Sequence, residues 1–175
     1  MSYYYEARPQ RILLPVNPLF VIGTLVTALV FNLLPWRDIA GIPDILALVL
    51  AFWCINQPRK IGVGTAWLFG LIMDTGNGAL LGQHAFAYAV LAFAANTLSR
   101  RILWFPIWPQ ALHVFLLLLG CQGLMLVIRL AAGSPFPGLL YFTGSIIAAV
   151  MWPLANFVLL SPQRRPESVD ENRPI

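Results

Sequence analysis

The sequence predicts an all-α membrane protein with six transmembrane helices and both termini in the cytoplasm. Of its 175 residues, 59% are hydrophobic and only 10% are charged, whereas a soluble domain carries about 25% charged residues. The basic residues stand in small groups between apolar stretches, and alternate groups hold nine residues on one side and two on the other. Because basic residues concentrate in cytoplasmic loops, this asymmetry indicates an even number of spans and cytoplasmic ends.

One membrane domain takes up most of the chain. We expect a cytoplasmic N-terminal segment at 1–11, a six-helix membrane domain at 12–160 and a disordered cytoplasmic tail at 161–175. The net charge of +4 does not indicate nucleic-acid binding, because the chain has no basic helix or stripe that would follow a phosphate backbone. Cys54 and Cys121 lie in separate apolar spans, so neither a disulfide framework nor a metal site is predicted.

The apolar runs define the spans in order. The first is long and is followed by no A-x-A-like cleavage site, so we interpret it as an uncleaved helix and not as a signal peptide. Asp44 lies about one turn inside the second span. A segment rich in Gly and Pro, 133–138, forms the loop before the last span. The predicted spans are 12–36, 39–56, two within 61–99, 110–131 and 139–160.

The third and fourth spans form a tight hairpin around the stretch 70–85, which reads GLIMDTGNGALLGQHA. Only 13 residues separate Lys60 from Asp74. As a helix they cover roughly 20 Å, which is less than the roughly 30 Å of a hydrocarbon core. The turn must therefore fall near the glycine-rich segment that ends at Gly82, and Asp74 is expected at or just inside the membrane boundary.

A stripe of small residues runs along one face of the third span and ends at this acid. Gly62, Ala66, Gly70 and Asp74 recur at every fourth position, so they share a helix face. Small residues let a second helix approach closely. We therefore predict that the stripe is a helix-packing face and that Asp74 faces protein, not lipid.

Polar residues gather on the predicted periplasmic side, namely Asp38, Asp44, Asp74, His84 and Arg129. Such residues in membrane proteins usually pair or face a cavity. One hypothesis is an ion pair of Arg129 with Asp74 or Asp44 that fixes helix register or meets a partner; the other is a set of separate residues wetted at the interface. For Asp74 the candidate donors are Arg129, His84 and the backbone of the turn. If its role is structural, Asp74→Asn keeps an acceptor and should be tolerated, whereas Asp74→Leu should not.

No set of residues predicts catalysis. Ser145 lacks G-x-S-x-G surroundings, and small residues on a transmembrane helix usually serve packing. The acids outside the terminal segments belong to no recognisable carboxylate-pair motif. No phosphate-binding Gly-rich loop follows a strand. We therefore expect no catalytic residue, no metal site and no cofactor.

Several short motifs occur in the order and spacing of one protein family. They are LPW at 34–36, PRKIGVGT at 58–65, GLIMD at 70–74, LGQHA at 81–85, WPQAL at 108–112 and WP at 152–153. In these motifs the chain resembles MreD, the family of rod shape-determining membrane proteins, in its proteobacterial form. The resemblance covers roughly 34–160, which is most of the membrane domain.

The resemblance implies a non-enzymatic, multi-pass protein of the bacterial inner membrane that belongs to the rod complex, or elongasome. The implied partners are the bitopic protein MreC and membrane lipid, with the filament protein MreB, the glycosyltransferase RodA and a transpeptidase in the same complex. The implied role is to position or regulate lateral peptidoglycan synthesis and so cell shape. The implied fold is similar to that of the S-components of energy-coupling-factor transporters.

A second function stays open, that of a small-molecule-binding membrane subunit of a vitamin-type transporter with the same fold. Those subunits present an A-x-x-x-A face on their first helix, and here Thr24-x-x-x-Ala28 is only a loose match. The predicted periplasmic loops are short and offer little polar material to recognise a vitamin. Neighbouring genes or copurifying proteins would separate the two functions.

Overall fold

The structure, a computed structural model, describes residues 17–34 and 41–163. In this part of the chain all regular structure is helical. The whole predicted N-terminal segment, most of the predicted C-terminal tail, the ends of the first span and Asp38 lie outside the described residues. The helices are α1 (Pro18–Leu33), α2 (Ile45–Asn56), α3 (Val63–Asn77), α4 (Gln83–Leu103), α5 (Ile107–Ala131), η1 (Leu139–Phe142), α6 (Thr143–Val150), α7 (Trp152–Leu160) and η2 (Ser161–Gln163).

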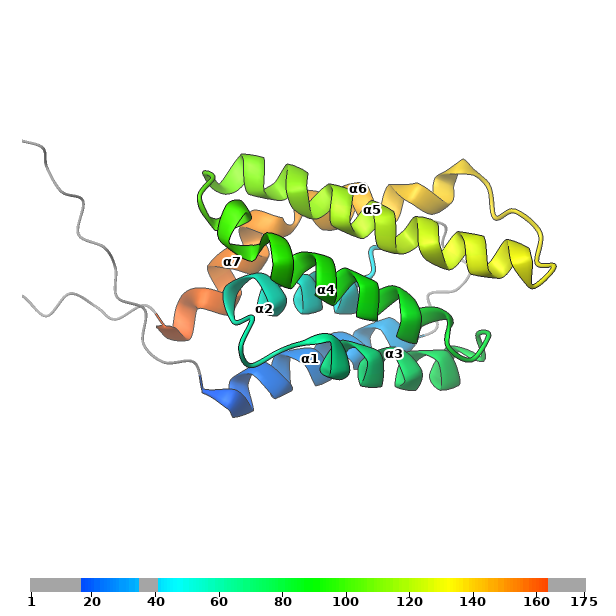
Figure 1. Ribbon diagram of the computed structural model, residues 1–175, viewed down its shortest axis with the longest axis horizontal. Coiled ribbons are helices and arrows are strands. Elements are labelled where there is room, and N and C mark those ends of the chain that lie inside the picture. Colours follow the sequence, from blue (N-terminus) through cyan, green and yellow to red (C-terminus); the bar gives the residue numbers. More distant parts are fainter. Residues whose placement is uncertain (1–16, 35–40, 164–175) are drawn as a thin grey trace, which may run out of the picture.

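The helices run back and forth between two ends of one bundle (Figure 1). Helices α1 to α5 alternate in direction, and α6 with α7 makes the final pass. The start of α1 and the end of α7 therefore lie at the same end, on the left in Figure 1. The α3–α4 turn and the loop from α5 to η1 lie at the opposite end, and we call this the polar end because Asp44, Asp74 and Arg129 belong to it.

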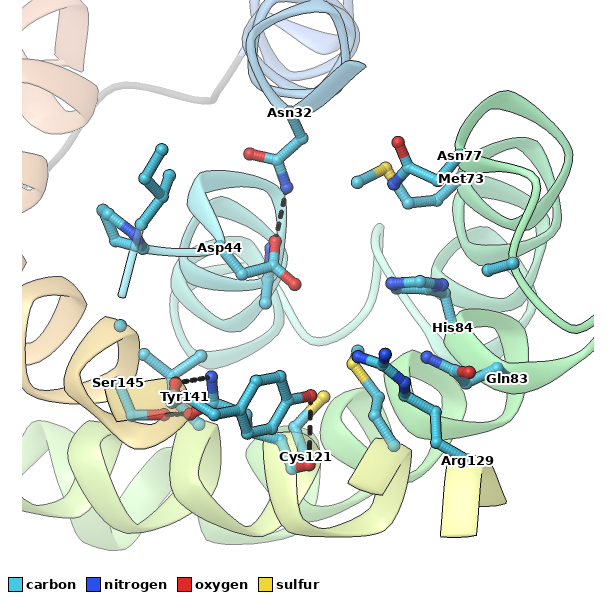
Figure 2. Close-up of a pocket in the computed structure, with 18 of the residues that line it drawn as sticks. Asn32, Asp44, Met73, Asn77, Gln83, His84, Cys121, Arg129, Tyr141 and Ser145 are labelled. Carbon is cyan, nitrogen blue, oxygen red and sulfur yellow. Dashed lines mark hydrogen bonds between the residues drawn. The ribbon is translucent and has the colours of Figure 1, made fainter. Parts of the chain in front are cut away.

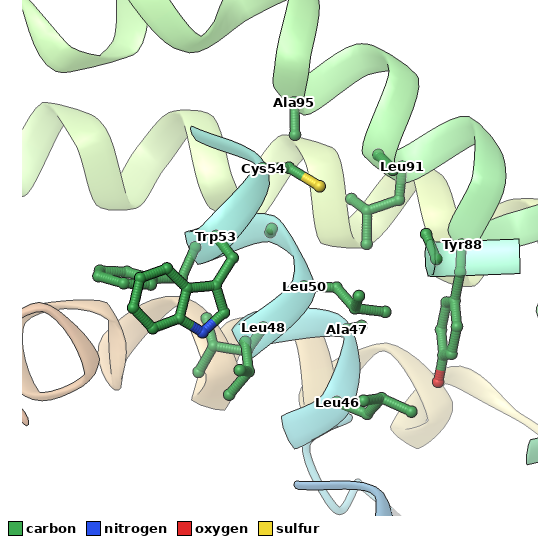
Figure 3. Packing of buried hydrophobic residues seen from close by; sticks show 14 of the residues in the cluster. Leu46, Ala47, Leu48, Leu50, Trp53, Cys54, Tyr88, Leu91 and Ala95 are labelled. Atoms are coloured by element: carbon green, nitrogen blue, oxygen red, sulfur yellow. The ribbon is translucent and has the colours of Figure 1, made fainter. Parts of the chain in front are cut away.

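Helix α2 is the centre of the bundle. Its sequence, ILALVLAFWCIN, is apolar on every side, and all ten residues from Leu46 to Ile55 are buried. A helix that is hydrophobic all round must be covered on all sides, and α2 is packed against α1, α4, α5, α6 and α7. Figure 3 shows its side chains beside Leu91 and Ala95 of α4. The Trp53 indole N–H donates to Thr24 Oγ1 of α1 at 3.0 Å, which satisfies the polar atom of this buried ring.

Asp44 does not lie inside the second helix, as the sequence predicted, but precedes it. Helix α2 begins at Ile45, and the Asp44 side chain is its N-cap. A short acidic side chain is favoured at this position because it accepts from a first-turn N–H that has no helical partner. The second helix is therefore 12 residues long, shorter than the predicted 39–56.

The last predicted span, 139–160, is broken into two helices. The segments Leu139–Val150 and Trp152–Gln163 meet at an angle of 44°. The break lies at Met151, two residues before Pro153. Proline has no N–H and its ring collides with the carbonyl four residues earlier, so a helix bends or stops just before it.

By length and composition, one helix among the described residues could cross a membrane alone, α5 at Ile107–Ala131. The bent pair that ends the bundle passes the same test when it is taken as one span. Helices α1 and α2 are apolar but shorter. The number of spans therefore stays a prediction that rests on the charge pattern.

Candidate functional site

The polar end of the bundle is built on the α3–α4 hairpin. Helix α3 ends at Asn77, where Gly78 adopts a left-handed conformation with φ 57°, and α4 begins after Gly82, with φ 97°. Glycine is the residue that takes such angles without strain. The turn at 78–82 lies within the glycine-rich segment that the sequence predicted.

Asp74 is fully buried and caps α4 from the neighbouring helix. Its Oδ2 accepts from the backbone N–H of Gly82 at 2.8 Å and of Ala85 at 3.3 Å. Its Oδ1 accepts from the backbone N–H of His84 at 2.8 Å and from His84 Nδ1 at 2.7 Å. The N-cap residue Gly82 has no side chain to bind these amides, so Asp74 supplies the cap that the local sequence lacks.

This geometry excludes one of the two hypotheses for the polar residues and changes one expectation. Arg129 forms no ion pair with Asp74 or Asp44; the donors to Asp74 are His84 and the first turn of α4. Both oxygens of Asp74 accept, so the expected tolerance of Asp74→Asn loses its basis. Whichever way an amide is turned, its NH2 group points at a backbone N–H of α4, and one buried donor is left without an acceptor.

The small-residue stripe contacts α4 at the end that lies near Asp74. A Cβ atom added at Gly70 would lie 2.5 Å from the Ala85 nitrogen and 2.7 Å from the His84 carbonyl carbon, so α3 and α4 are in backbone contact here. Ala66 is fully buried. Gly62 differs from the prediction: it is the N-cap of α3, and a Cβ there would have no neighbour within 4 Å.

Asp44 joins three helices at the same end of the bundle. Its Oδ1 accepts from Ala47 N–H at 2.8 Å, which caps α2, and from Asn32 Nδ2 of α1 at 2.6 Å. Its Oδ2 accepts from the Tyr88 hydroxyl of α4 at 2.7 Å. Asn32 Oδ1 in turn accepts from Ile45 N–H at 3.2 Å. Hydrogen bonds of this kind fix helix register in an apolar bundle.

A cavity of about 700 Å³ opens between these elements (Figure 2). Asp44, His84 and Arg129, three of the predicted residues, line it together, whereas Asp74, Ala66 and Gly70 are not among its lining residues. The part of the chain that the structure describes holds no cluster of His, Cys, Asp or Glu able to bind a metal ion.

The comparisons with known proteins identify the family. A model of the family described as rod shape-determining protein MreD matches residues 12–161. The chain belongs to the MreD family. The rod shape-determining protein MreD of Haemophilus influenzae is 29% identical to it over 151 residues, which are 83% of this chain and 90% of that protein. No solved structure matches the chain.

Membership of the MreD family confirms the resemblance found in the motifs. MreD proteins are membrane proteins that determine rod shape and are not a known enzyme family, and the apolar helices described above agree with this. The sequence predicted that polar residues gather at one end of this MreD-family chain, but it did not predict the contact of Tyr88 with Asp44. The signal for it was a hydroxyl group among apolar neighbours in the fourth predicted span.

Proposed function

We propose that the chain is a non-enzymatic component of the rod complex in the bacterial inner membrane, where it binds MreC and helps to position or regulate lateral peptidoglycan synthesis. The observation that carries the proposal is the family match over residues 12–161, which spans the whole predicted membrane domain. MreB, RodA and a transpeptidase would act in the same complex. The chain's influence on cell shape would follow from these contacts.

The bonding at the polar end supports a structural role for its acids. Asp44 and Asp74 each accept hydrogen bonds from backbone N–H groups at the start of a helix. A carboxylate used in this way orders the bundle and is not free to transfer protons to a substrate. We propose that Ala66, Gly70 and Gly82 serve the same end, because they let the α3–α4 hairpin close.

We further propose six membrane spans with cytoplasmic termini, in an arrangement similar to the S-components. Two observations support this. The helices alternate in direction, with α6 and α7 as one broken pass (Figure 1). In the sequence, the basic residues divide nine to two between alternate segments that separate the predicted spans. Helix α2, with only 12 residues, would cross as the shielded centre of the bundle.

The outer surface of α1 offers room for a partner's membrane span. Large apolar side chains on its outer face are exposed, with Leu19 at 76% and Val30 at 56%. In a membrane such a surface contacts lipid or another helix. Between helices, close packing supplies the association energy, because lipid is as apolar as the partner. A bitopic protein such as MreC would bring one such helix.

Affinity purification of the tagged full-length chain from the membranes of its native host tests the proposal. Proteins that copurify are identified and compared with those held by an unrelated tagged membrane protein. The proposal predicts enrichment of a bitopic MreC-type protein and of wall-synthesis enzymes. Enrichment of transporter ATPase subunits without these proteins would contradict it and would favour the vitamin-type transporter subunit.

A further inference from the structure

The cavity at the polar end has the dimensions of a ligand site. Its volume of about 700 Å³ lies within the range of roughly 300–1,000 Å³ that is usual for small-molecule sites. The walls come from the end of α1, the start of α2, the α3–α4 hairpin, the second half of α5 with the loop after it, η1 and α6. Both polar and apolar side chains line it, as in sites that bind an amphiphilic molecule.

Most polar groups of the wall are already bonded to protein. The Asp44 carboxylate accepts from three donors. Gln122 Nε2 donates to the Tyr141 carbonyl oxygen at 2.7 Å, and Gln122 Oε1 accepts from the Ser145 hydroxyl. These groups therefore shape the wall and are not free to select a charged ligand.

Among the charged groups of the wall, Arg129 is the exception. Among the described residues its guanidinium has no ion-pair or hydrogen-bond partner, although its side chain is only partly exposed and extends into the cavity (Figure 2). It carries five N–H donors in a planar fork that fits a phosphate or carboxylate. The Gln83 side chain, also in the wall and 5% exposed, is likewise without a partner among the described residues.

His84 adds a second requirement. A carboxylate only accepts, so Nδ1 carries the hydrogen that is directed to Asp74, and Nε2 is the ring nitrogen left to meet a ligand. The ring reaches into the cavity from α4 (Figure 2). A molecule that satisfies both residues carries an anionic group for Arg129 and, for His84 Nε2, a hydroxyl group, which can both donate and accept.

We propose that this cavity binds a hydroxyl-bearing phosphate, such as the phosphoglycerol or sugar-phosphate group of a lipid or of a soluble ester. A lipid headgroup and a soluble phosphate share this chemistry. A lipid would be held at the depth where headgroups lie, because the cavity opens at the end of the bundle that the sequence assigns to the membrane boundary. The site is independent of the contacts proposed for the rod complex.

Native mass spectrometry of the purified full-length protein tests the lipid source, with phosphatidylglycerol as the probe and phosphatidylcholine, which lacks the hydroxyls, as the comparison. Isothermal titration with glycerol 3-phosphate tests the soluble source. Wild type is expected to bind one of the two hydroxylated probes saturably. Arg129→Gln should weaken that binding by about tenfold or more, because it removes a charge-assisted contact. Arg101→Gln is the control and should leave the binding unchanged, because Arg101 is exposed and lies far along α4.

Gel filtration and a second variant distinguish a loss of binding from a loss of the fold. Arg129→Gln must elute as wild type does in gel filtration; if it does not, Met125→Trp, which fills the cavity from a buried position and keeps the arginine, replaces it. Equal binding by wild type and the variant overturns the proposal, as does equal retention of both lipids or the absence of binding to any probe. Binding of the lipid alone or of the soluble ester alone supports it and names the source.

Discussion

Gly70→Ala tests the contact on which the polar end is built. The added Cβ would lie 2.5 Å from the Ala85 nitrogen, whereas ordinary contacts fall at 3.4–4 Å. The neighbour is helix backbone, which cannot rotate away as a side chain would, so α3 and α4 must separate by roughly 1 Å. That shift stretches the 2.8 Å hydrogen bonds that backbone N–H groups at the start of α4 donate to Asp74 beyond useful length. We expect this overpacking to lower the free energy of unfolding by about 1–3 kcal/mol, and Gly70→Leu should lower it further.

Thermal unfolding of the purified protein in detergent measures this loss of stability. The abundance of the variant in membranes is measured beside it. Gly64→Ala is the matched control, because Gly64 lies in the same helix and a Cβ there would meet nothing within 4 Å. The control should leave the unfolding temperature unchanged or raise it, since alanine favours helix over glycine by about 0.5–1 kcal/mol. An unfolding temperature for Gly70→Ala equal to that of wild type would show that the helices are not in backbone contact.

Three other predictions follow from the same end of the bundle. Asp74→Asn should lower the free energy of unfolding by about 1–3 kcal/mol, because one buried N–H loses its acceptor, and Asp74→Leu should lower it further; wild-type stability of the Asn variant would be incompatible with the four hydrogen bonds described. Tyr88→Phe removes the hydroxyl that donates at 2.7 Å to the Asp44 carboxylate, the N-cap of α2, so denaturation should show a free energy of unfolding lower by about 1.5–3 kcal/mol. Reporter fusions after Gln57 and Ser99 should read cytoplasmic and fusions after Gly133 periplasmic; a cytoplasmic signal after Gly133 would exclude the proposed topology.

The hairpin could be predicted because its signals are local. The position of the turn is narrowly limited by the sequence. It is set by the charge at Lys60, the acid at Asp74 and the glycines between Asp74 and His84. Helical periodicity alone aligned Ala66 and Gly70 with Asp74. The structure confirms that Gly70 meets the neighbouring helix and that Asp74 is buried against protein.

The pairing of the polar residues could not be predicted in the same way. Opposite charge made an Asp74–Arg129 pair one of the hypotheses, but the first turn of α4 offers the backbone donors that bind Asp74, and Gly82 leaves them uncapped. Which side chains meet across a bundle depends on helix rotation and on the ends of helices, and both are set by packing. The break at Met151 could be predicted from Pro153, which is a local signal. The hydrogen bond from Tyr88 to Asp44 could not, because it depends on how α2 and α4 pack.

The role in rod shape is tested most directly by depleting the chain in its native host and following cell outline by microscopy. We expect rods to widen and become round as the protein is lost. Plasmid-borne wild type and Gly64→Ala should restore rods, and Gly70→Leu should not. Cells that keep a normal rod shape after complete depletion would contradict the proposed function, whatever proteins copurify with the chain.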